Sequence, residues 1–453
     1  MTIIGSLFLI ALFYFCYRLV SGLSDKQTGG KLLYLEGLRG VAALIVVIFH
    51  FLRCFFPASI NGNPSTAHLP FETLIALSPF YLIYSGTFYV AIFFILSGFV
   101  LSYNFFSTHS VKNVISSASR RYTRLALPVL VTSSIYYLML QTGAFQADYY
   151  QHLAQVTHSD NFHNRYNFEF GFWDMLEHSI FSVFFEFNQA KYNNVLWTMP
   201  YEFYGSMIIF SFLLVFGKSK FRLVGYTALL LFLFVVIKKP EFIAFVFGMI
   251  LSDLHVNGRL EKLKTHFSKY ILLILGCYLA GFNDYLEPRF LQSSSHAWML
   301  SSLNFFKTLY VPGRLLIIIG ASIILLSILS SKRLQSLFSN RFCVFLGKIS
   351  FTLYLSHYVV LFSVSCLAFD WLRASFSYSS ASLISFIISM PLFFIIAWFL
   401  YLWVDRASVV LGGKLYKKHM EKPLDQGQQW IKEKILTLTI LKQPIKEIIK
   451  QVN

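Results

Sequence analysis

Residues 35–51 read LEGLRGVAALIVVIFHF, an apolar run with one arginine near its start and one histidine near its end. Arg39 and His50 are eleven positions apart, close to three turns of an α-helix, so their side chains share one face about 16 Å apart along the axis. Ionisable groups inside a bilayer usually face a bundle interior or a wet cavity. Taken singly, Arg39 could snorkel to lipid phosphate and His50 could bond to a neighbouring helix. The shared face favours a functional pair.

The composition of the chain points to a membrane protein. Of 453 residues, 56% are hydrophobic and only 13% are charged, against roughly 25% charged in a soluble globular chain. Fifty Phe and 26 Tyr are too many for ordinary cores, and only lipid can solvate so much apolar surface. We therefore predict an all-α fold, a polytopic transmembrane helical bundle.

Apolar runs of roughly 15–25 residues predict about ten core helices plus one extra N-terminal helix. We expect residues 1–30 to form a retained N-terminal membrane anchor helix and linker, and residues 31–412 to form the transmembrane domain. Within that domain, 142–195 is predicted to be an external loop, and 413–453 to be a basic cytoplasmic tail. The expected spans are 2–20, 38–56, 79–103, 125–141, 196–216, 222–237, 241–255, 270–283, 312–330, 346–368 and 382–404.

The net charge of +17 comes from 38 basic and 21 acidic residues, and the basic ones lie between the apolar runs. The positive-inside rule explains this pattern better than nucleic-acid binding, so we expect no nucleic-acid partner. The basic stretches 104–124, 256–269 and 331–348 and the tail fall on one side, predicted to be the cytoplasmic side of a plasma membrane whose anionic lipids the tail contacts. Lys238 and Lys239 fall on the wrong side of this topology.

The cysteine pattern predicts free thiols. The five cysteines are scattered in or beside apolar segments, with no CxxC pair and no histidine nearby at metal spacing. This distribution argues for buried free thiols and against a disulfide framework or a metal site.

Small and basic residues interrupt two further segments. Ser97 and Gly98 break a bulky apolar run, which suits helix packing or the close approach of a thin ligand arm. Arg120, Arg121 and Arg124 suit a topology anchor or a phosphate clamp, because guanidinium groups match phosphate oxygens.

Two later segments carry polar groups inside apolar runs. Glu202 follows Pro200, and a lone acid in a membrane span is either ion-paired or a functional candidate. Ser350, Tyr354 and His357 share one helical face, which suits interhelical hydrogen bonds or the lining of a site.

Together these segments resemble the acyltransferase 3 family, integral-membrane O-acyltransferases that modify sugars and lipids at cell surfaces. The resemblance covers about 31–412, nearly all of the transmembrane part. Its five motifs are LRGVAALIVVIFH at 38–50, FFILSGFVLS at 93–102, RRYTRLALP at 120–128, LWTMPYEFYG at 196–205 and ISFTLYLSHYVV at 349–360.

The chain departs from the family pattern in three places. It adds residues 1–20, it reads Thr-Met-Pro at 198–200 where Ser-Leu-Ser is commoner, and it has Asp405 where many members have glutamate followed by proline. We expect no attached hydrolase-like domain.

The resemblance implies transfer of an acyl group, expected to be acetyl, from cytoplasmic acyl-CoA to a hydroxyl on the far side of the membrane. It implies that His50 is the general base and that Glu202 orients or stabilises its imidazole. Trp197, Tyr354 and His357 are expected on the acceptor side. The residues implied in binding acyl-CoA are Arg39, Arg120, Arg121, Arg124, Ser97 and Gly98.

The acceptor implied by the resemblance is a carbohydrate or lipid-linked compound that presents a hydroxyl, and the oligomeric state stays open. The competing class is a transporter or flippase, in which internal arginine, histidine and glutamate residues relay protons and move a polar solute.

Overall fold

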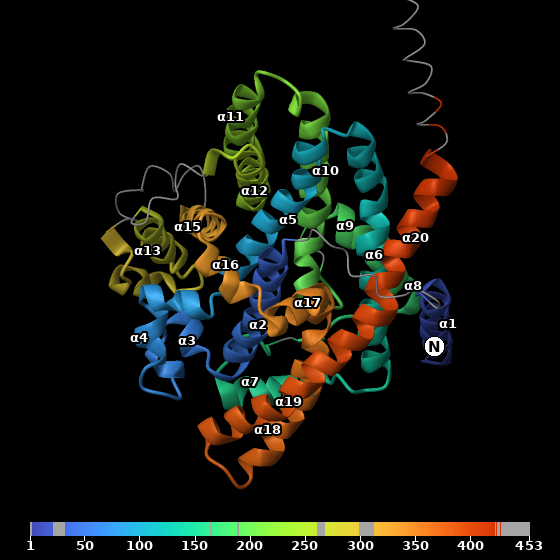
Figure 1. Ribbon diagram of the computed structural model, residues 1–453. Helices are drawn as coiled ribbons and strands as arrows, with labels where there is room; N and C mark the ends of the chain where they lie inside the picture. Colours follow the sequence, from blue (N-terminus) through green and yellow to red (C-terminus); the bar gives the residue numbers. More distant parts are fainter. Residues whose placement is uncertain are drawn as a thin grey trace, which may run out of the picture.

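The computed structural model describes residues 2–20, 32–163, 165–187, 190–260, 268–298 and 312–421, together with residues 423 and 426. This described part of the chain contains helices and no strand, which confirms the predicted all-α class. Figure 1 shows the helices gathered into one bundle, with α2, α5, α10 and α17 near its centre. Residues 21–31 of the expected linker and nearly all of the tail beyond 421 lie outside the described residues.

The first half of the chain supplies the central helices and a set of short ones. Its elements are α1 (Thr2–Val20), α2 (Leu33–Phe55), α3 (Ala58–Asn61), η1 (Pro64–Thr66), α4 (Glu72–Ala76), η2 (Pro79–Ile83), α5 (Gly86–Thr108), α6 (Val111–Gln141), α7 (Ala147–Thr157), α8 (Phe172–Glu177), η3 (His178–Ser182), α9 (Val183–Phe185), η4 (Asn194–Thr198) and α10 (Met199–Phe216).

The second half continues the bundle around these helices. Its elements are α11 (Arg222–Phe232), η5 (Leu233–Ile237), α12 (Pro240–Val256), α13 (Ser268–Ala280), η7 (Pro288–Ser293), α15 (Pro312–Leu329), α16 (Lys332–Phe338), α17 (Arg341–Val360), η9 (Leu361–Ser365), α18 (Cys366–Arg373), α19 (Tyr378–Leu400), η10 (Tyr401–Asp405), α20 (Arg406–Tyr416) and η11 (Lys417–Glu421).

Six helices of the described part are long and apolar enough to cross a membrane, or seven if the bent pair α15–α16, with its 103° angle, counts as one span. This number is lower than the expected eleven, although each expected span falls on a helix. Apart from the bent pair, four helices account for the difference: α1, α11 with η5, and α13 are shorter apolar helices, and α12, with 17 residues, is also too short to be counted. The expected N-terminal helix is present as α1, which packs against α6 and α20.

Two helix starts differ from the predicted spans. The span predicted from residue 79 begins as the short turn η2, and α5 itself begins at Gly86. Helix α6 begins at Val111, well before residue 125, so Arg120, Arg121 and Arg124 lie within a helix. Arginine is a good helix former, and the hydropathy of the stretch marks only where its apolar part begins.

The segment expected to form an external loop at 142–195 has two parts. Helix α7 contacts η9, since the Tyr150 hydroxyl donates to the Phe362 carbonyl oxygen and the two rings are 5.6 Å apart, while α8 to α9 run alongside α6 (Figure 1). The Phe172 ring is 6.2 Å from that of Tyr137, and the Phe184 ring is 5.4 Å from that of Tyr122. Fifteen helical residues separate the two tyrosines, so α8 to α9 follow α6 for about 22 Å. The external position of 142–195 stays a prediction.

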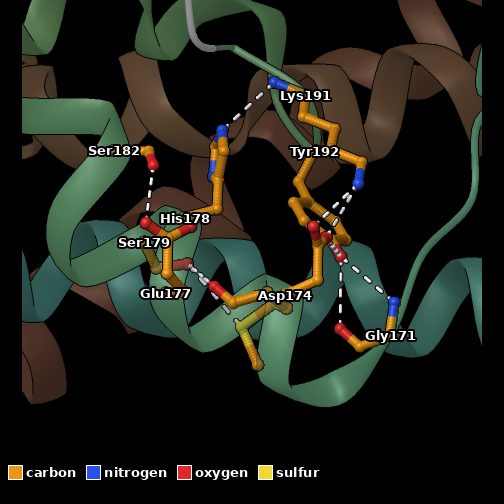
Figure 2. Close-up of polar contacts among 9 residues, drawn as sticks. Gly171, Asp174, Glu177, His178, Ser179, Ser182, Lys191 and Tyr192 are labelled. Atoms are coloured by element: carbon orange, nitrogen blue, oxygen red, sulfur yellow. Dashed lines mark hydrogen bonds and ion pairs between the residues drawn. The ribbon is translucent and has the colours of Figure 1, made fainter. Parts of the chain in front are cut away.

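Polar contacts hold the end of this segment in place (Figure 2). The Lys191 ammonium lies 2.9 Å from both oxygens of Asp174, which also accepts a hydrogen bond from the Tyr192 hydroxyl. The Lys191 backbone N–H donates to His178 Nε2 at 3.2 Å, and Ser182 donates to Glu177. These contacts fix the chain just before η4.

Helices α5 and α12 pack with their backbones nearly in contact. A Cβ atom added at Gly98 would lie 2.0 Å from the Phe245 carbonyl oxygen, and one added at Gly248 would lie 1.9 Å from that of Ile95. Only glycine fits at these two crossings, because any Cβ there would push the helices apart.

We predict that Gly98→Ala lowers the free energy of unfolding by about 1–3 kcal/mol, because the added methyl group overpacks the crossing. Chemical unfolding in mixed micelles measures this change. Gly413→Ala is the matched control, since its Cβ would meet no atom within 4 Å. Equal unfolding curves for the two variants would show that α5 and α12 are not in close contact.

Candidate active site

A cavity of about 630 Å³ lies between α2, α5, α6, α10, α17 and α20. Most of the residues predicted to bind acyl-CoA line it, although they come from three different helices. Its polar lining residues include Arg39, Arg120, Arg121, Arg124, Ser97, Glu202, Ser350 and Tyr354. The structure thus brings together side chains from all five sequence motifs.

Arg121 is held by Glu202 within this cavity. The Arg121 guanidinium forms an ion pair with Glu202 and donates through Nε to the Ser206 hydroxyl at 2.7 Å. The Ser97 hydroxyl donates to the same carboxylate, 3.0 Å from Oε1. Three helices, α5, α6 and α10, are therefore joined through one carboxylate.

Among the residues that the structure describes, the remaining arginines of the cavity have no carboxylate partner. Within the described chain, neither Arg39 nor Arg124 forms an ion pair with an acidic side chain, and Arg120 donates to the Ser116 carbonyl oxygen at 2.9 Å. Arg120 also lies 6.0 Å from the centre of the Tyr416 ring. These guanidinium groups can bind phosphate oxygens, for which their planar fork is suited.

Gly98 does not line this cavity. It is buried against the Phe245 carbonyl oxygen on α12, whereas its neighbour Ser97 faces the cavity. Consecutive helical residues point about 100° apart, so the two small residues serve different faces of α5. The prediction that Gly98 contacts a ligand arm is therefore corrected, and its small size serves helix packing.

A second cavity, of about 50 Å³, lies beyond the first along α2. His50 and Trp197 line it, and its walls include Val90, Phe94 and Tyr354, which also line the larger cavity. The two cavities are therefore separated by a wall only one side chain thick, and His50 stands on the far side of that wall from Arg39.

The imidazoles of His50 and His357 are 3.1 Å apart, between His50 Nδ1 and His357 Nε2. His50 Nδ1 is also 3.0 Å from the Val46 carbonyl oxygen, and His357 Nδ1 is 3.1 Å from that of Leu353. A carbonyl oxygen only accepts hydrogen bonds, so this network assigns a proton to each Nδ1. His50 Nδ1–H then donates to Val46 and His357, and His50 Nε2 keeps a free lone pair.

This network differs from the predicted pairing of His50 with Glu202. The Glu202 carboxylate bonds to Ser97 and Arg121 in the larger cavity, and it does not line the smaller one. His357, expected only on the acceptor side, occupies the place next to His50. A histidine can accept the Nδ1–H bond that an acid accepts in a catalytic triad.

Tyr354 forms part of the wall between the cavities. Its hydroxyl donates to the Val195 carbonyl oxygen at 2.8 Å and lies 3.0 Å from the Thr198 hydroxyl. Its proton is therefore already engaged, and the side chain positions η4 against α17. Trp197, which is next to Thr198, is placed in the smaller cavity by this contact.

Sequence reasoning missed a charged group in the smaller cavity, which His50 also lines. Arg314 and Glu241 line the smaller cavity and are paired at 2.9 Å, and Arg314 Nε lies 3.4 Å from Asp284. Burial raises the pKa of the Asp284 carboxyl above its ordinary value, although Arg314 and the Thr87 hydroxyl bond to it. Glu241 and Arg314 are charged residues at the starts of the apolar spans predicted at 241–255 and 312–330. A charged residue in an apolar span is the signal that identified Glu202, and it could have identified these two as well.

We predict that Glu202→Gln lowers the free energy of unfolding by about 3 kcal/mol, because it leaves the Arg121 charge without its partner. Both side chains are well buried, 12% and 14% exposed, so solvent screens the pair weakly. Unfolding in mixed micelles measures the loss. The double variant Arg121→Gln/Glu202→Gln should lose less than the sum of the single variants. Strict additivity would contradict the pairing.

Comparison with known proteins identifies the family. A family model described as an acyltransferase domain matches residues 32–418. The O-acetyltransferase PaAT-1 of Phomopsis amygdali is 28% identical over 361 residues, which cover 72% of this chain and 71% of that protein.

Two further relatives match over most of their length. Acyltransferase clz18 of Cochliobolus lunatus and acyltransferase R4 of a Phoma species are each 22% identical and cover 87% of this chain and 94% of their own length. No solved structure matches the chain. The chain therefore belongs to the acyltransferase 3 family of membrane O-acyltransferases.

Proposed function

We propose that this protein transfers an acetyl group from acetyl-CoA bound in the larger cavity to a hydroxyl group held in the smaller one. The observation that carries the proposal is the position of His50. His50 lines a cavity that shares the walls Val90, Phe94 and Tyr354 with the arginine-lined cavity, and its Nε2 carries the free lone pair. A base at that wall can reach a hydroxyl on one side while a thioester approaches from the other.

The donor side is argued from charge. Arg39, Arg120 and Arg124 have no carboxylate partner in the described chain and face a cavity large enough for an extended ligand. We propose that they bind the phosphates of acetyl-CoA, while Glu202 holds Arg121 in a fixed orientation beside them. The pantetheine arm passes Ser97 on its way to the wall.

The acyl transfer itself needs one base. His50 Nε2 removes the proton of the acceptor hydroxyl while its oxygen attacks the thioester carbonyl carbon, and the C–S bond then breaks. The proton on His50 passes to the departing thiolate, which leaves as coenzyme A. His357 Nε2 accepts the His50 Nδ1–H bond throughout, so it orients the ring and stabilises the imidazolium.

The topology follows from the direction of α2. We propose that the Arg39 end faces the cytoplasm, where acetyl-CoA is found, and that the Phe55 end faces the opposite side of a plasma membrane. The C-terminus is then cytoplasmic, as the basic stretches predict.

The acceptor is a compound with a free hydroxyl, and the expected classes are a carbohydrate or a lipid-linked molecule. The test incubates the purified protein with labelled acetyl-CoA and acceptor. An acetyltransferase transfers the label to the acceptor, whereas a transporter moves a solute across the membrane and leaves the acceptor unlabelled.

We predict that His50→Ala lowers kcat/KM about a hundred- to ten-thousand-fold, the range that a general base contributes. His357→Leu should lower kcat about ten- to a hundred-fold, because it removes one hydrogen bond to the charged imidazolium. Radiolabelled acetyl transfer by purified protein measures both effects. His163→Ala, at a half-exposed histidine, is the control. Near-full activity of His50→Ala would remove it from the chemistry.

We predict that Arg39→Ala raises the KM for acetyl-CoA about tenfold with a smaller change in kcat, because it removes a charge-assisted bond to phosphate. Steady-state kinetics at varied acetyl-CoA measure the split. The control is Arg333→Ala, an exposed arginine on α16 that lines neither cavity. A fall in kcat at unchanged KM would instead assign Arg39 a structural role.

A further inference from the structure

Two arginines near His50 have no acidic partner in the described chain. Arg53 lies one turn beyond His50 on α2, and its guanidinium carbon is 5.1 Å from the centre of the Tyr285 ring. The half-buried Arg53 side chain forms no hydrogen bond with a described residue. A guanidinium carries five N–H donors, and in such a place these must be met by water or by a ligand.

The second arginine, Arg165, comes from the segment between α7 and α8. Its guanidinium carbon is 4.4 Å from the centre of the Phe362 ring and 5.4 Å from that of Tyr358. Asn161 accepts from Arg165 Nε at 3.2 Å and from Nη2 at 2.9 Å, which leaves Nη1 without a partner among the described residues. The aromatic faces hold the charge without neutralising it.

Direct contacts bring the two arginines to the same place. The Ser159 hydroxyl donates to the Arg53 carbonyl oxygen at 2.6 Å, and the Asn161 amide donates to Cys54 Sγ at 2.9 Å. Ser159 and Asn161 are thus attached to the end of α2, and Asn161 bonds to both Arg165 and Cys54, the neighbour of Arg53.

Both charges are close to the smaller cavity. Tyr285, below Arg53, lines that cavity, and the Tyr358 ring, beside Arg165, is 4.8 Å from the His50 ring. Each guanidinium is therefore one aromatic side chain away from the cavity or from His50.

The neighbouring Arg314 differs from Arg53 and Arg165 because it has acidic partners. It is paired with Glu241 and Asp284, two carboxylates that are each 7% exposed. The same region therefore neutralises one arginine with two acids and leaves two others uncompensated. Uncompensated guanidinium groups in a half-buried site attract anionic oxygens strongly, because the local dielectric constant is low.

We propose that Arg53 and Arg165 bind an anionic oxygen group, such as a carboxylate or phosphate, carried by the acceptor itself. This inference rests on the proposed function and names the acceptor class. The acceptor hydroxyl then lies at His50 while its anionic group lies nearly one helical turn farther out, about 5 Å along the axis of α2. A phospholipid headgroup carries the same chemistry. The aromatic walls, Tyr358 and Phe362, are each 1% exposed, which favours a ligand held inside the bundle.

The test compares para-hydroxymethylbenzoate with its methyl ester, which has the same hydroxyl but no charge. Calorimetric titration measures the binding of each probe to the full-length protein in phosphatidylcholine nanodiscs. We expect the acid to bind at least about tenfold more tightly than the ester, the effect of a charge-assisted contact. Arg53→Gln and Arg165→Gln should bring the ratio of acid affinity to ester affinity toward one, and Arg53→Lys should keep part of the preference for the acid. Acetyl-CoA binding verifies that each variant is folded.

Arg289→Gln is the matched control, because Arg289 is exposed, pairs with Glu287 and lines neither cavity. Its ratio should equal that of the wild type. Equal affinity of wild type for acid and ester overturns the inference, as does a ratio that survives both arginine substitutions. Loss of the acid preference on adding phosphatidylglycerol assigns the arginines to lipid phosphate and also overturns it. If the protein prefers the acid but transfers no labelled acetyl group, the result contradicts the proposed acetyl transfer and leaves the anion site at Arg53 and Arg165 supported.

Discussion

The close contact between α2 and α17 is the constraint on which the site depends. A Cβ atom at Gly40 would lie 2.3 Å from the Gly347 backbone nitrogen, so the two helices cross with almost no side chain between them. This separation lets an imidazole from each helix meet at 3.1 Å, nearly three turns farther along both helices. Wider helix spacing would leave His50 Nδ1 bonded only to the Val46 carbonyl oxygen of its own helix, without the contact to His357.

Charge compensation separates structural arginines from those available to ligands. Arg121 and Arg314 are each held by buried carboxylates from other helices, so they join helices in the way that buried ion pairs do. Arg39 and Arg124 face the larger cavity, and Arg53 stands near the smaller one, without such partners in the described chain. In a bundle surrounded by lipid, an uncompensated charge is too costly to be kept without a function.

The sequence predicted local features well and partners poorly. Helical periodicity correctly placed Arg39 and His50 on one face, because that relation depends only on the rise and turn of a single helix. The partner of His50 is 307 positions away, and the partner of Arg121 is 81 positions away. Such pairs depend on how helices pack, which neither hydropathy nor spacing specifies. For the same reason the motif predicts one role for the adjacent Ser97 and Gly98, although Ser97 faces the larger cavity and Gly98 faces α12.

The difference in size between the two cavities bears on how transfer would exclude hydrolysis. The larger cavity, at about 630 Å³, can hold an extended donor, whereas the smaller, at about 50 Å³, has room for only a few water molecules. An acceptor hydroxyl with its attached carbon fills much of that space and displaces the water that His50 could otherwise activate. A general base activates water as readily as an alcohol, so selectivity for the acceptor must come from occupancy of the cavity. The small volume beside His50 is therefore as much a part of the site as the imidazole.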